Sequence, residues 1–439
     1  MRILVVLFIL LSSMGLNAQL FFNELASMPE AVTNNAVTQG SVNGEIYVYS
    51  FAGLDSTKLY SGIHKKAWRY SVANDIWEAI DPLPSGNGRI AAGASTVKNK
   101  IYIIGGYEVF SNGNESSFDE VHVYDPETNS YLPDAAPCLL PIDDHVQAVW
   151  KDSLIFVVTG WSNNGNVAVV QIFNPTENTW EFGTSVPSSN DYRVFGATGT
   201  IIGDTLYYAG GASDACCNPA FPPVSFFRKG YINPDDPTDI TWSGYEAEEA
   251  QIYRGIVLQN TDGQPTWVFG ADLTYNYNGI DYNGTGGVEP SDDFVTYEFY
   301  STGELVGDDF VNSLPVMDLR GFGLMDNLGM SGAIIAGGME PGQVVSNKTY
   351  FVQIGIIWGT SNLSTLDIQC FPNPNSGVVF FEPFGEYEVQ LSTLDGHLIS
   401  TGKVFSGDSF VLPELSTGVY FLRIMDQEGK YKLEKLVIR

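Results

Sequence analysis

Four arginines occupy one repeated place in the sequence, and their spacing suggests binding chemistry. Each lies 17 or 18 residues before the small residue that ends a β-type run, in the pairs Arg89 and Gly106, Arg193 and Gly211, Arg254 and Ala271, and Arg320 and Gly338. At the matching place, other runs have Asn34 and Asn35, or Asp143, Asp144 and His145. Guanidinium groups bind carboxylates through paired hydrogen bonds. The pattern raises the hypothesis of an anion pocket with the candidate ligand-binding residues Arg89, Arg193, Arg254, Arg320, Asn35, Asp144 and His145.

A structural interpretation competes with this pocket, because such arginines also bond to neighbouring backbone or pair with an aspartate. The sequence offers little else for chemistry. The four histidines have no zinc-like spacing, and neither a Gly-x-Ser-x-Gly motif nor a phosphate-binding loop is present. The segment 280–293 is rich in oxygen ligands but lacks EF-hand spacing, so we expect a solvated loop there. We predict no catalytic residue, no metal and no cofactor.

The elements that must position these residues are repeated strands. Six β-type runs end in small residues, at 45–53, 100–106, 154–160, 205–211, 266–271 and 333–338, and their ends are spaced by 53, 54, 51, 60 and 67 residues. A second element, with an aromatic residue, a turn and another aromatic seven residues on, follows at 70–77, 124–131 and 173–180. This element is typical of a hairpin. Phe22 has a proline seven residues later, as Trp77 and Trp180 do, so it is predicted to lie in the final strand of a repeat.

These marks resemble the kelch family of β-propellers, over residues 19–358. The runs ending in Gly-Gly, the Tyr-Asp-Pro turn at 124–126 and the Trp before the next repeat carry the resemblance, although Thr159-Gly160 and Gly270-Ala271 depart from it. The resemblance implies an all-β fold, a six-bladed propeller of four-stranded blades. Stacking such blades around an axis buries faces that one blade leaves open. The strand at Leu20–Glu24 would complete the last blade beside Lys348–Gln353 and close the ring.

In such a blade the second strand runs antiparallel to the first, so its end lies beside the start of the first strand. The arginines are therefore predicted to share one face with the long loops 54–66, 107–120, 212–227 and 272–293. Those loops carry the aromatic residues Tyr107, Phe221, Tyr275, Tyr277 and Tyr282. A positive centre with an aromatic rim suits a carboxylate that is attached to a sugar or an apolar ring.

After a polar linker at 359–365, residues 366–439 show alternating apolar strands and Asp-Gly or Thr-Gly turns, which are typical of a small Ig-like β-sandwich. The segment Phe371-Pro372-Asn373-Pro374, the Leu-Asp-Gly turn at 394–396 and the segment around Gly418 and Tyr420 resemble the type A sorting domain of the type IX secretion system of Bacteroidetes. This resemblance implies export to the cell surface by that machinery. A carbohydrate-binding sandwich is the alternative.

The N-terminus and the composition agree with export. Residues 1–18 have a basic start, a short apolar core and Ala18, as in a secretory signal peptide, and no transmembrane segment is expected in the mature chain. The net charge of −30 argues against nucleic-acid binding and favours a soluble monomer. Four cysteines leave disulfide pairing open, since Cys216 and Cys217 are adjacent and one of them can pair with Cys138.

The sequence thus predicts a secreted or surface-attached kelch propeller that binds a glycan or a protein on its loop-rich face, with acidic sugars favoured if the arginines form a pocket. The alternative is a carbohydrate-active enzyme of the sialic acid mutarotase type, which the kelch resemblance suggests. Mutarotation needs a placed acid and base, for which Asp144, His145 and a loop tyrosine are available. A purely structural or adhesive surface component is a third interpretation.

Overall fold

In a computed structural model, the regular secondary structure of the described residues consists almost wholly of β-strands. The described residues are 17–215, 221–260, 263–275, 277, 288–298, 303–309, 314–325, 332–357, 368–375, 377–382, 385–393, 398–405, 409–426 and 431–438. The two helical segments in this part of the chain are single 3-10 turns, η1 (Tyr60–Gly62) and η2 (Glu248–Ala250). The prediction of an all-β protein is confirmed.

The first five repeats each form an antiparallel sheet of four consecutive main strands, written from the innermost strand outwards. The first has β3 (Ala36–Val42), β4 (Glu45–Asp55), β5 (Ile63–Ser71) and β6 (Ile76–Ile80). The second has β7 (Gly93–Val97), β8 (Lys100–Ile104), β11 (Val121–Asp125) and β12 (Ser130–Tyr131). The third has β13 (Val146–Trp150), β14 (Leu154–Val158), β15 (Val170–Asn174) and β16 (Thr179–Gly183).

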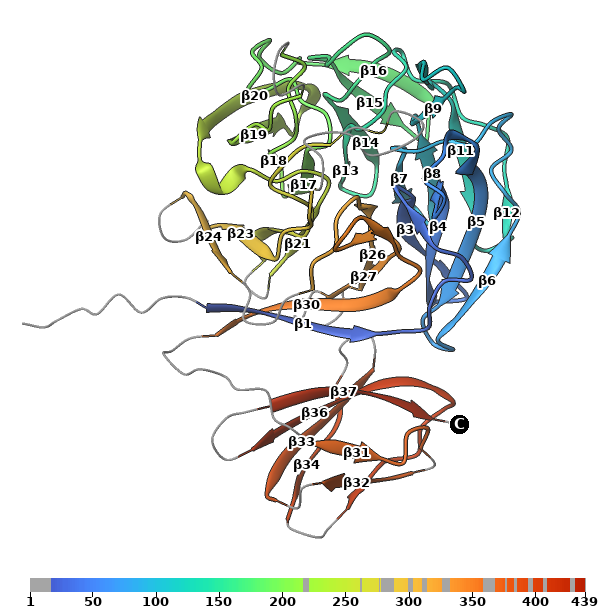
Figure 1. The fold of residues 1–439 in the computed structure, drawn as a ribbon, viewed down its shortest axis with the longest axis vertical. Coiled ribbons are helices and arrows are strands. Elements are labelled where there is room, and N and C mark those ends of the chain that lie inside the picture. The colour runs from blue at the N-terminus through green and yellow to red at the C-terminus, as the bar shows by residue number, and fades with distance from the viewer. Residues whose placement is uncertain are drawn as a thin grey trace, which may run out of the picture.

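The fourth sheet has β17 (Thr198–Ile202), β18 (Thr205–Ala209), β19 (Phe226–Asn233) and β20 (Asp236–Glu246). The fifth has β21 (Ile256–Gln259), β22 (Pro265–Val268), β23 (Asp293–Tyr297) and β24 (Leu305–Asp309). Two short strands, β2 (Val32–Thr33) and β25 (Arg320–Gly321), pair with the first sheet. Two further hairpins consist of β9 (Tyr107–Val109) with β10 (Glu115–Ser117) and of β28 (Met339–Glu340) with β29 (Val344–Val345). Figure 1 shows the sheets arranged around a common axis.

The sixth sheet joins the two ends of the propeller. It contains β26 (Gly323–Met325), β27 (Gly332–Ala336), β30 (Thr349–Ile357) and, as its outermost strand, β1 (Asn17–Glu24). Strand β1 pairs antiparallel with β30, from Leu20 opposite Ile354 to Glu24 opposite Tyr350. The predicted closure of the ring by the N-terminal strand is confirmed, and Figure 1 shows the two strands side by side.

The hairpins predicted from paired aromatics are also present, and a left-handed turn residue explains their spacing. Asp75, Asn129 and Asn178 have φ values of 52°, 50° and 54°. The Tyr70 hydroxyl donates to Asp75 Oδ1 at 2.6 Å, and the Tyr124 hydroxyl donates to Asn129 Oδ1 at 2.6 Å. Asn and Asp tolerate this conformation better than other non-glycine residues. The turn and the first aromatic therefore stabilise each other.

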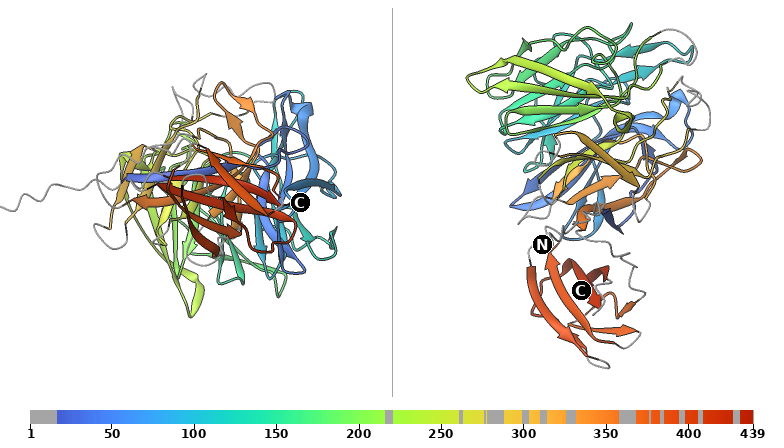
Figure 2. Two further views of the ribbon diagram at one scale, coloured as in Figure 1. Left: turned by 90° about the horizontal axis from the view of Figure 1, so that it is seen from below. Right: turned by 90° about the vertical axis from the view of Figure 1, so that its left-hand side faces the viewer.

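The C-terminal residues form a second, smaller β-domain, which the right-hand view of Figure 2 shows below the propeller. One sheet has β31 (Gln369–Phe371), β32 (Val378–Glu382) and β35 (Phe410–Val411), and the other has β34 (Leu398–Val404), β33 (Tyr387–Thr393), β36 (Gly418–Asp426) and β37 (Tyr431–Ile438). A core that includes Val379, Val389 and Leu422 lies between them. Cys138 and Cys370 are free thiols, whereas Cys216, Cys217 and residues 1–16 lie outside the described residues.

Candidate functional site

Each repeat places one residue in the left-handed conformation just before its innermost strand. Hydrogen bonds link these residues into a closed circle, which we call the axial ring. Its members, with φ values from 50° to 69°, are Asn34, Ala91, Asp144, Gly196, Arg254 and Asp318. The successive bonds run from Asn34 N to Asp318 O, Ala91 N to Asn34 Oδ1, Asp144 N to Ala91 O, Gly196 N to Asp144 O, Arg254 N to Gly196 O and Leu319 N to Arg254 O, at 2.8 to 3.2 Å.

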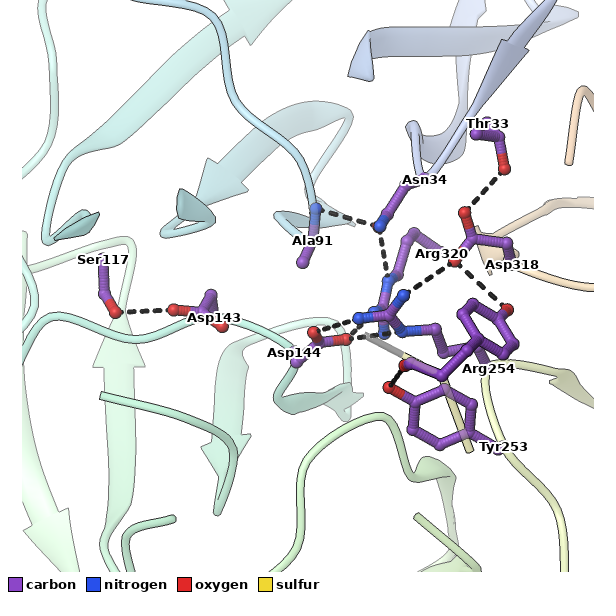
Figure 3. Close-up of polar contacts among 11 residues, drawn as sticks. Thr33, Asn34, Ala91, Ser117, Asp143, Asp144, Tyr253, Arg254, Asp318 and Arg320 are labelled. Carbon is purple, nitrogen blue, oxygen red and sulfur yellow. Dashed lines mark hydrogen bonds and ion pairs between the residues drawn. The ribbon is translucent and has the colours of Figure 1, made fainter. Parts of the chain in front are cut away.

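The Arg254 side chain crosses the axial ring and joins two aspartates from other repeats (Figure 3). Its Nε and Nη2 donate to the two carboxylate oxygens of Asp144 at 3.3 and 2.6 Å, and its Nη1 donates to Asp318 Oδ1 at 3.1 Å. All three residues are at most 3% exposed. Burial alone would lower the pKa of Arg254, but Tyr253, Asp318 and Tyr275 raise it well above its usual value. Arg254 is therefore a buried cation with matched counter-charges.

Arg320 approaches the same carboxylate from the strand β25. Its guanidinium forms an ion pair with Asp144, and its Nε donates to Asn34 Oδ1 at 2.9 Å. Thr33 donates to the other oxygen of Asp318 at 2.7 Å. The centre of the ring thus holds two arginines and two aspartates, which balance in charge.

A second group of carboxyls lies beside this centre. Asp143 is 3% exposed and accepts a hydrogen bond from the Ser117 hydroxyl at 2.6 Å. Burial and, to a smaller extent, the Glu115 carboxylate raise the pKa of Asp143 to about 7, although the Ser117 hydrogen bond and the two arginines oppose the shift. Burial also raises the pKa of Glu115 to about 7, although Arg254 opposes the effect. Near neutral pH these two groups can hold or release a proton, as a general acid or base must.

The structure does not bring Arg89 and Arg193 to this centre. Arg89 is buried within the second repeat, where it pairs with Glu120, donates to Gly105 O at 2.9 Å and lies over the Phe118 ring at 4.3 Å. Arg193 is half-buried and donates to Asn166 O at 3.3 Å and Asn190 Oδ1 at 3.1 Å. Equal sequence spacing does not place these arginines equally. The ring residues lie 15 to 20 residues before the small residues, so an arginine 17 or 18 residues before a small residue is a ring residue in one repeat and precedes or follows the ring residue in another.

The two remaining candidate residues, Asn35 and His145, have different surroundings. The Asn35 amide is buried and donates to Ser50 Oγ at 2.8 Å and Ala336 O at 3.2 Å, which ties the first repeat to the last. His145 faces a cavity of about 100 Å³ among the innermost strands, which Gln147 and Arg320 also line. Its Nε2 lies 2.8 Å from Gln147 Oε1, and burial lowers the pKa of His145 to about 4. His145 is therefore neutral at physiological pH.

The long loops connect second to third strands as predicted, but most of the predicted rim aromatics are buried. Tyr107, Tyr275 and Tyr277 are at most 2% exposed, and they pack in one apolar cluster with Tyr253 from the same side of the ring. Phe221 is half-buried against this cluster, while Tyr282 and most of the segment 280–293 lie outside the described residues. The aromatic residues thus cover the charged centre instead of lining an open pocket.

Other apolar side chains of the same face are exposed, and the sequence reasoning missed them. They are 41 to 56% exposed and comprise Leu59, Tyr60, Phe110, Leu139, Leu273 and Val344. All six lie in connections that leave a second strand or enter the next repeat, and these connections include η1 and β29, so the six residues share the face of the axial ring. These exposed side chains differ from the buried tyrosines in their position within the connections and not in residue type.

The residues of the predicted sorting motif lie at one end of the C-terminal domain. Asn373 accepts a hydrogen bond from Val437 N at 2.9 Å and donates to Lys435 O, which ties the motif to β37. Pro372 O accepts from Asn375 Nδ2 at 3.0 Å. Phe371 stacks on Phe380, Gly418 begins β36, and the Tyr420 hydroxyl donates to Ser416 O at 2.9 Å. Pro374 belongs to the same segment.

No group of three or more His, Cys, Asp and Glu side chains among the described residues is arranged to hold a metal ion. No helix in the part of the chain that the structure describes has the length and apolar composition to span a membrane.

Similarity to known proteins lies in the same two domains. The Kelch motif model matches residues 88–132, and the model of the Secretion system C-terminal sorting domain matches residues 369–439. A solved structure described as "Structure of YjhT" is similar with a TM-score of 0.55 and 15% identity, covering 82% of this chain and 99% of the other. At this identity the likeness concerns the fold.

The curated relatives match parts of the propeller. Kelch-like protein 25 of Xenopus tropicalis is 27% identical over 39% of this chain, beta-scruin of Limulus polyphemus is 28% identical over 35%, and the Rab9 effector protein with kelch motifs of Mus musculus is 32% identical over 33%. The matches span 29%, 16% and 35% of these relatives' lengths. With the two family models and the fold, they identify a kelch β-propeller with a C-terminal type IX sorting domain, a protein that is secreted or held at the cell surface.

Proposed function

We propose that the propeller is an extracellular binding protein whose ligand, a glycan or another protein, contacts the tips of its long loops. The observation that carries this proposal is the set of exposed apolar side chains on the face of the axial ring. Aromatic and large apolar side chains that stand in water at loop tips are typical of recognition surfaces. We further propose that the chain reaches this role through the type IX secretion machinery and acts as a monomer.

The ring itself supports this proposal as a scaffold. Arg254 and Arg320 already have Asp144 and Asp318 as counter-ions, so the centre carries no surplus positive charge for an acidic sugar. The hydrogen-bonded circle instead fixes where the innermost strands begin. A neutral glycan or a protein surface suits this arrangement better than an anion.

The test is a screen of the purified full chain against glycan arrays and surface proteins, followed by variants. The change Phe110→Ser should weaken binding of any hit by about tenfold or more, as expected for an aromatic contact in an interface. Tyr231→Ser is the matched control, since Tyr231 is 51% exposed but lies beside the opposite, short-turn end of its repeat. Equal loss in both variants, or no loss in Phe110→Ser, would place the ligand elsewhere.

The second candidate function is the carbohydrate-active enzyme of mutarotase type, favoured by Asp143 and Glu115. Both carboxyls titrate near pH 7 beside the ring, and such groups suit the proton transfers that exchange sugar anomers. Nuclear magnetic resonance of sialic acid anomers with and without the protein tests this activity. Faster exchange that is lost in Glu115→Gln would favour the enzyme, and an unchanged rate would favour binding alone.

A further inference from the structure

The sorting domain contacts the propeller through two neighbouring strands, β36 and β37. Figure 1 shows β36 and β37 next to the edge of the propeller where β1 runs. Side chains alternate along a strand, so β36 presents two different faces. Tyr420, Leu422 and Ile424 belong to the core of the sandwich, whereas Val419 and Phe421 belong to a cluster of propeller residues. Both faces of this strand are therefore buried from Gly418 to Leu422.

The contact is apolar at its centre. Phe421 is 3% exposed, and its ring lies 4.8 Å from the ring of Phe351 in β30, with 37° between the two planes. Val419 is 5% exposed, and the same cluster contains Trp77 of β6. The partners of β36 thus come from the first and the last repeat, where β1 closes the ring.

One ion pair lies at the edge of this apolar contact. Lys435 Nζ of the sorting domain lies 2.7 Å from Asp75 Oδ2, and the two side chains are 23% and 14% exposed. Asp75 is held in place, because its other oxygen accepts hydrogen bonds from Ala26 N at 2.7 Å and the Tyr70 hydroxyl at 2.6 Å. The propeller therefore presents a fixed carboxylate to the sorting domain.

We propose that the propeller is the docking partner of its own sorting domain and that docking covers the outer face of β36. The occupant of the apolar surface around Phe351 is the segment that contains Val419, Phe421 and Lys435. Two surfaces on one chain meet at an effective concentration on the order of millimolar, so a modest contact suffices to keep them together. Any protein that binds the outer face of β36 must first displace the propeller.

Chemical labelling of lysines in the full chain tests this proposal. Lys435 is compared with Lys403, an exposed lysine of the same domain whose side chain is 68% accessible. An amine-reactive reagent, followed by mass spectrometry, measures the labelling rates of Lys435 and Lys403 in the same sample. We expect Lys435 to react several-fold more slowly than Lys403 in the wild type. Equal rates in the wild type would overturn the proposal.

Two variants separate docking from folding. Phe421→Ala changes the sorting domain, and Phe351→Ala changes the propeller and leaves the sandwich intact. Each removes a buried aromatic contact and should shift the docking equilibrium by about tenfold or more, so that the Lys435 rate approaches that of Lys403. Phe405→Ala, at an exposed position of the sorting domain, is the control and should change neither rate. If both folded variants keep Lys435 protected, its slow reaction has another cause and the proposal fails.

Discussion

Asp143 carries a carboxyl group whose ionisation makes the stability of the propeller depend on pH. Burial and then Glu115 raise its pKa from 3.8 to about 7 in the folded protein. The unfolded chain loses this proton near pH 4, whereas the folded protein keeps it until about pH 7. The folded state therefore binds the extra proton between these values. Its stability is greatest below the lower pKa and falls as the pH rises to about 7.

The size of this effect follows from the two pKa values. Each pKa unit corresponds to about 1.4 kcal/mol, so moving from 3.8 to about 7 corresponds to on the order of 4 kcal/mol. The variant Asp143→Asn has no charge at any pH and keeps an oxygen that can accept from Ser117. We expect the stability of this variant relative to the wild type to rise between pH 4 and pH 8. Above pH 8 the difference in stability should no longer change.

Urea unfolding at pH 5, 6, 7 and 8 measures this difference. The control is Asp204→Asn, because a hydrogen bond from Lys151 lowers the pKa of the half-buried Asp204. The stability that comes from a lowered pKa is complete above about pH 4, so the difference between this variant and the wild type should stay constant from pH 5 to pH 8. A difference for Asp143→Asn that stays constant from pH 5 to pH 8 would refute a protonated Asp143 in the folded protein.

Three further changes probe the ring and its closure. Asp144→Asn removes the carboxylate that two buried guanidiniums share and should cost about 3–5 kcal/mol of unfolding free energy in urea, whereas Asp204→Asn, at a surface ion pair, should cost much less. Gly210→Ala should lower the melting temperature far more than Gly203→Ala. Both glycines have positive φ, but a Cβ at Gly210 would lie 1.9 Å from Ile252 O, whereas a Cβ at Gly203 would meet no atom within 4 Å. Deletion of β1 should abolish the cooperative thermal transition in circular dichroism, because β30 loses its outer partner.

The sequence predicted the repeats well because each one carries its own local marks. Small residues end the second strands where the backbone turns with positive φ, as at Gly106 and Gly211, and paired aromatics flank the hairpin turns. The pairing of β1 with β30 followed from the same marks, since Phe22 has the Trp-to-Pro spacing of a final strand. Such features repeat with the local fold and can be read one repeat at a time.

The axial ring could not be predicted in this way. Its members have different residue types, from Ala91 to Arg254, because most of the bonds that link them run between backbone atoms and do not depend on the side chain. Counting back from the small residues misplaced Arg89 and Arg193, since the stretch between the ring residue and the small residue varies from 15 to 20 residues. Burial likewise depends on tertiary packing, which is why Tyr107 and Tyr275 looked like rim residues but are core residues.

The closure of the ring by β1 also determines the order of folding. The paired residues of β1 and β30 are more than 320 positions apart along the chain. Contacts at such separation form slowly, because the chain loses entropy in closing the loop before the contact stabilises it. Neighbouring repeats can stack as soon as each is synthesised, but the first and last repeats can meet only when β30 exists. Joining them is therefore the final step of propeller assembly, and until then the edge of β1 has no partner.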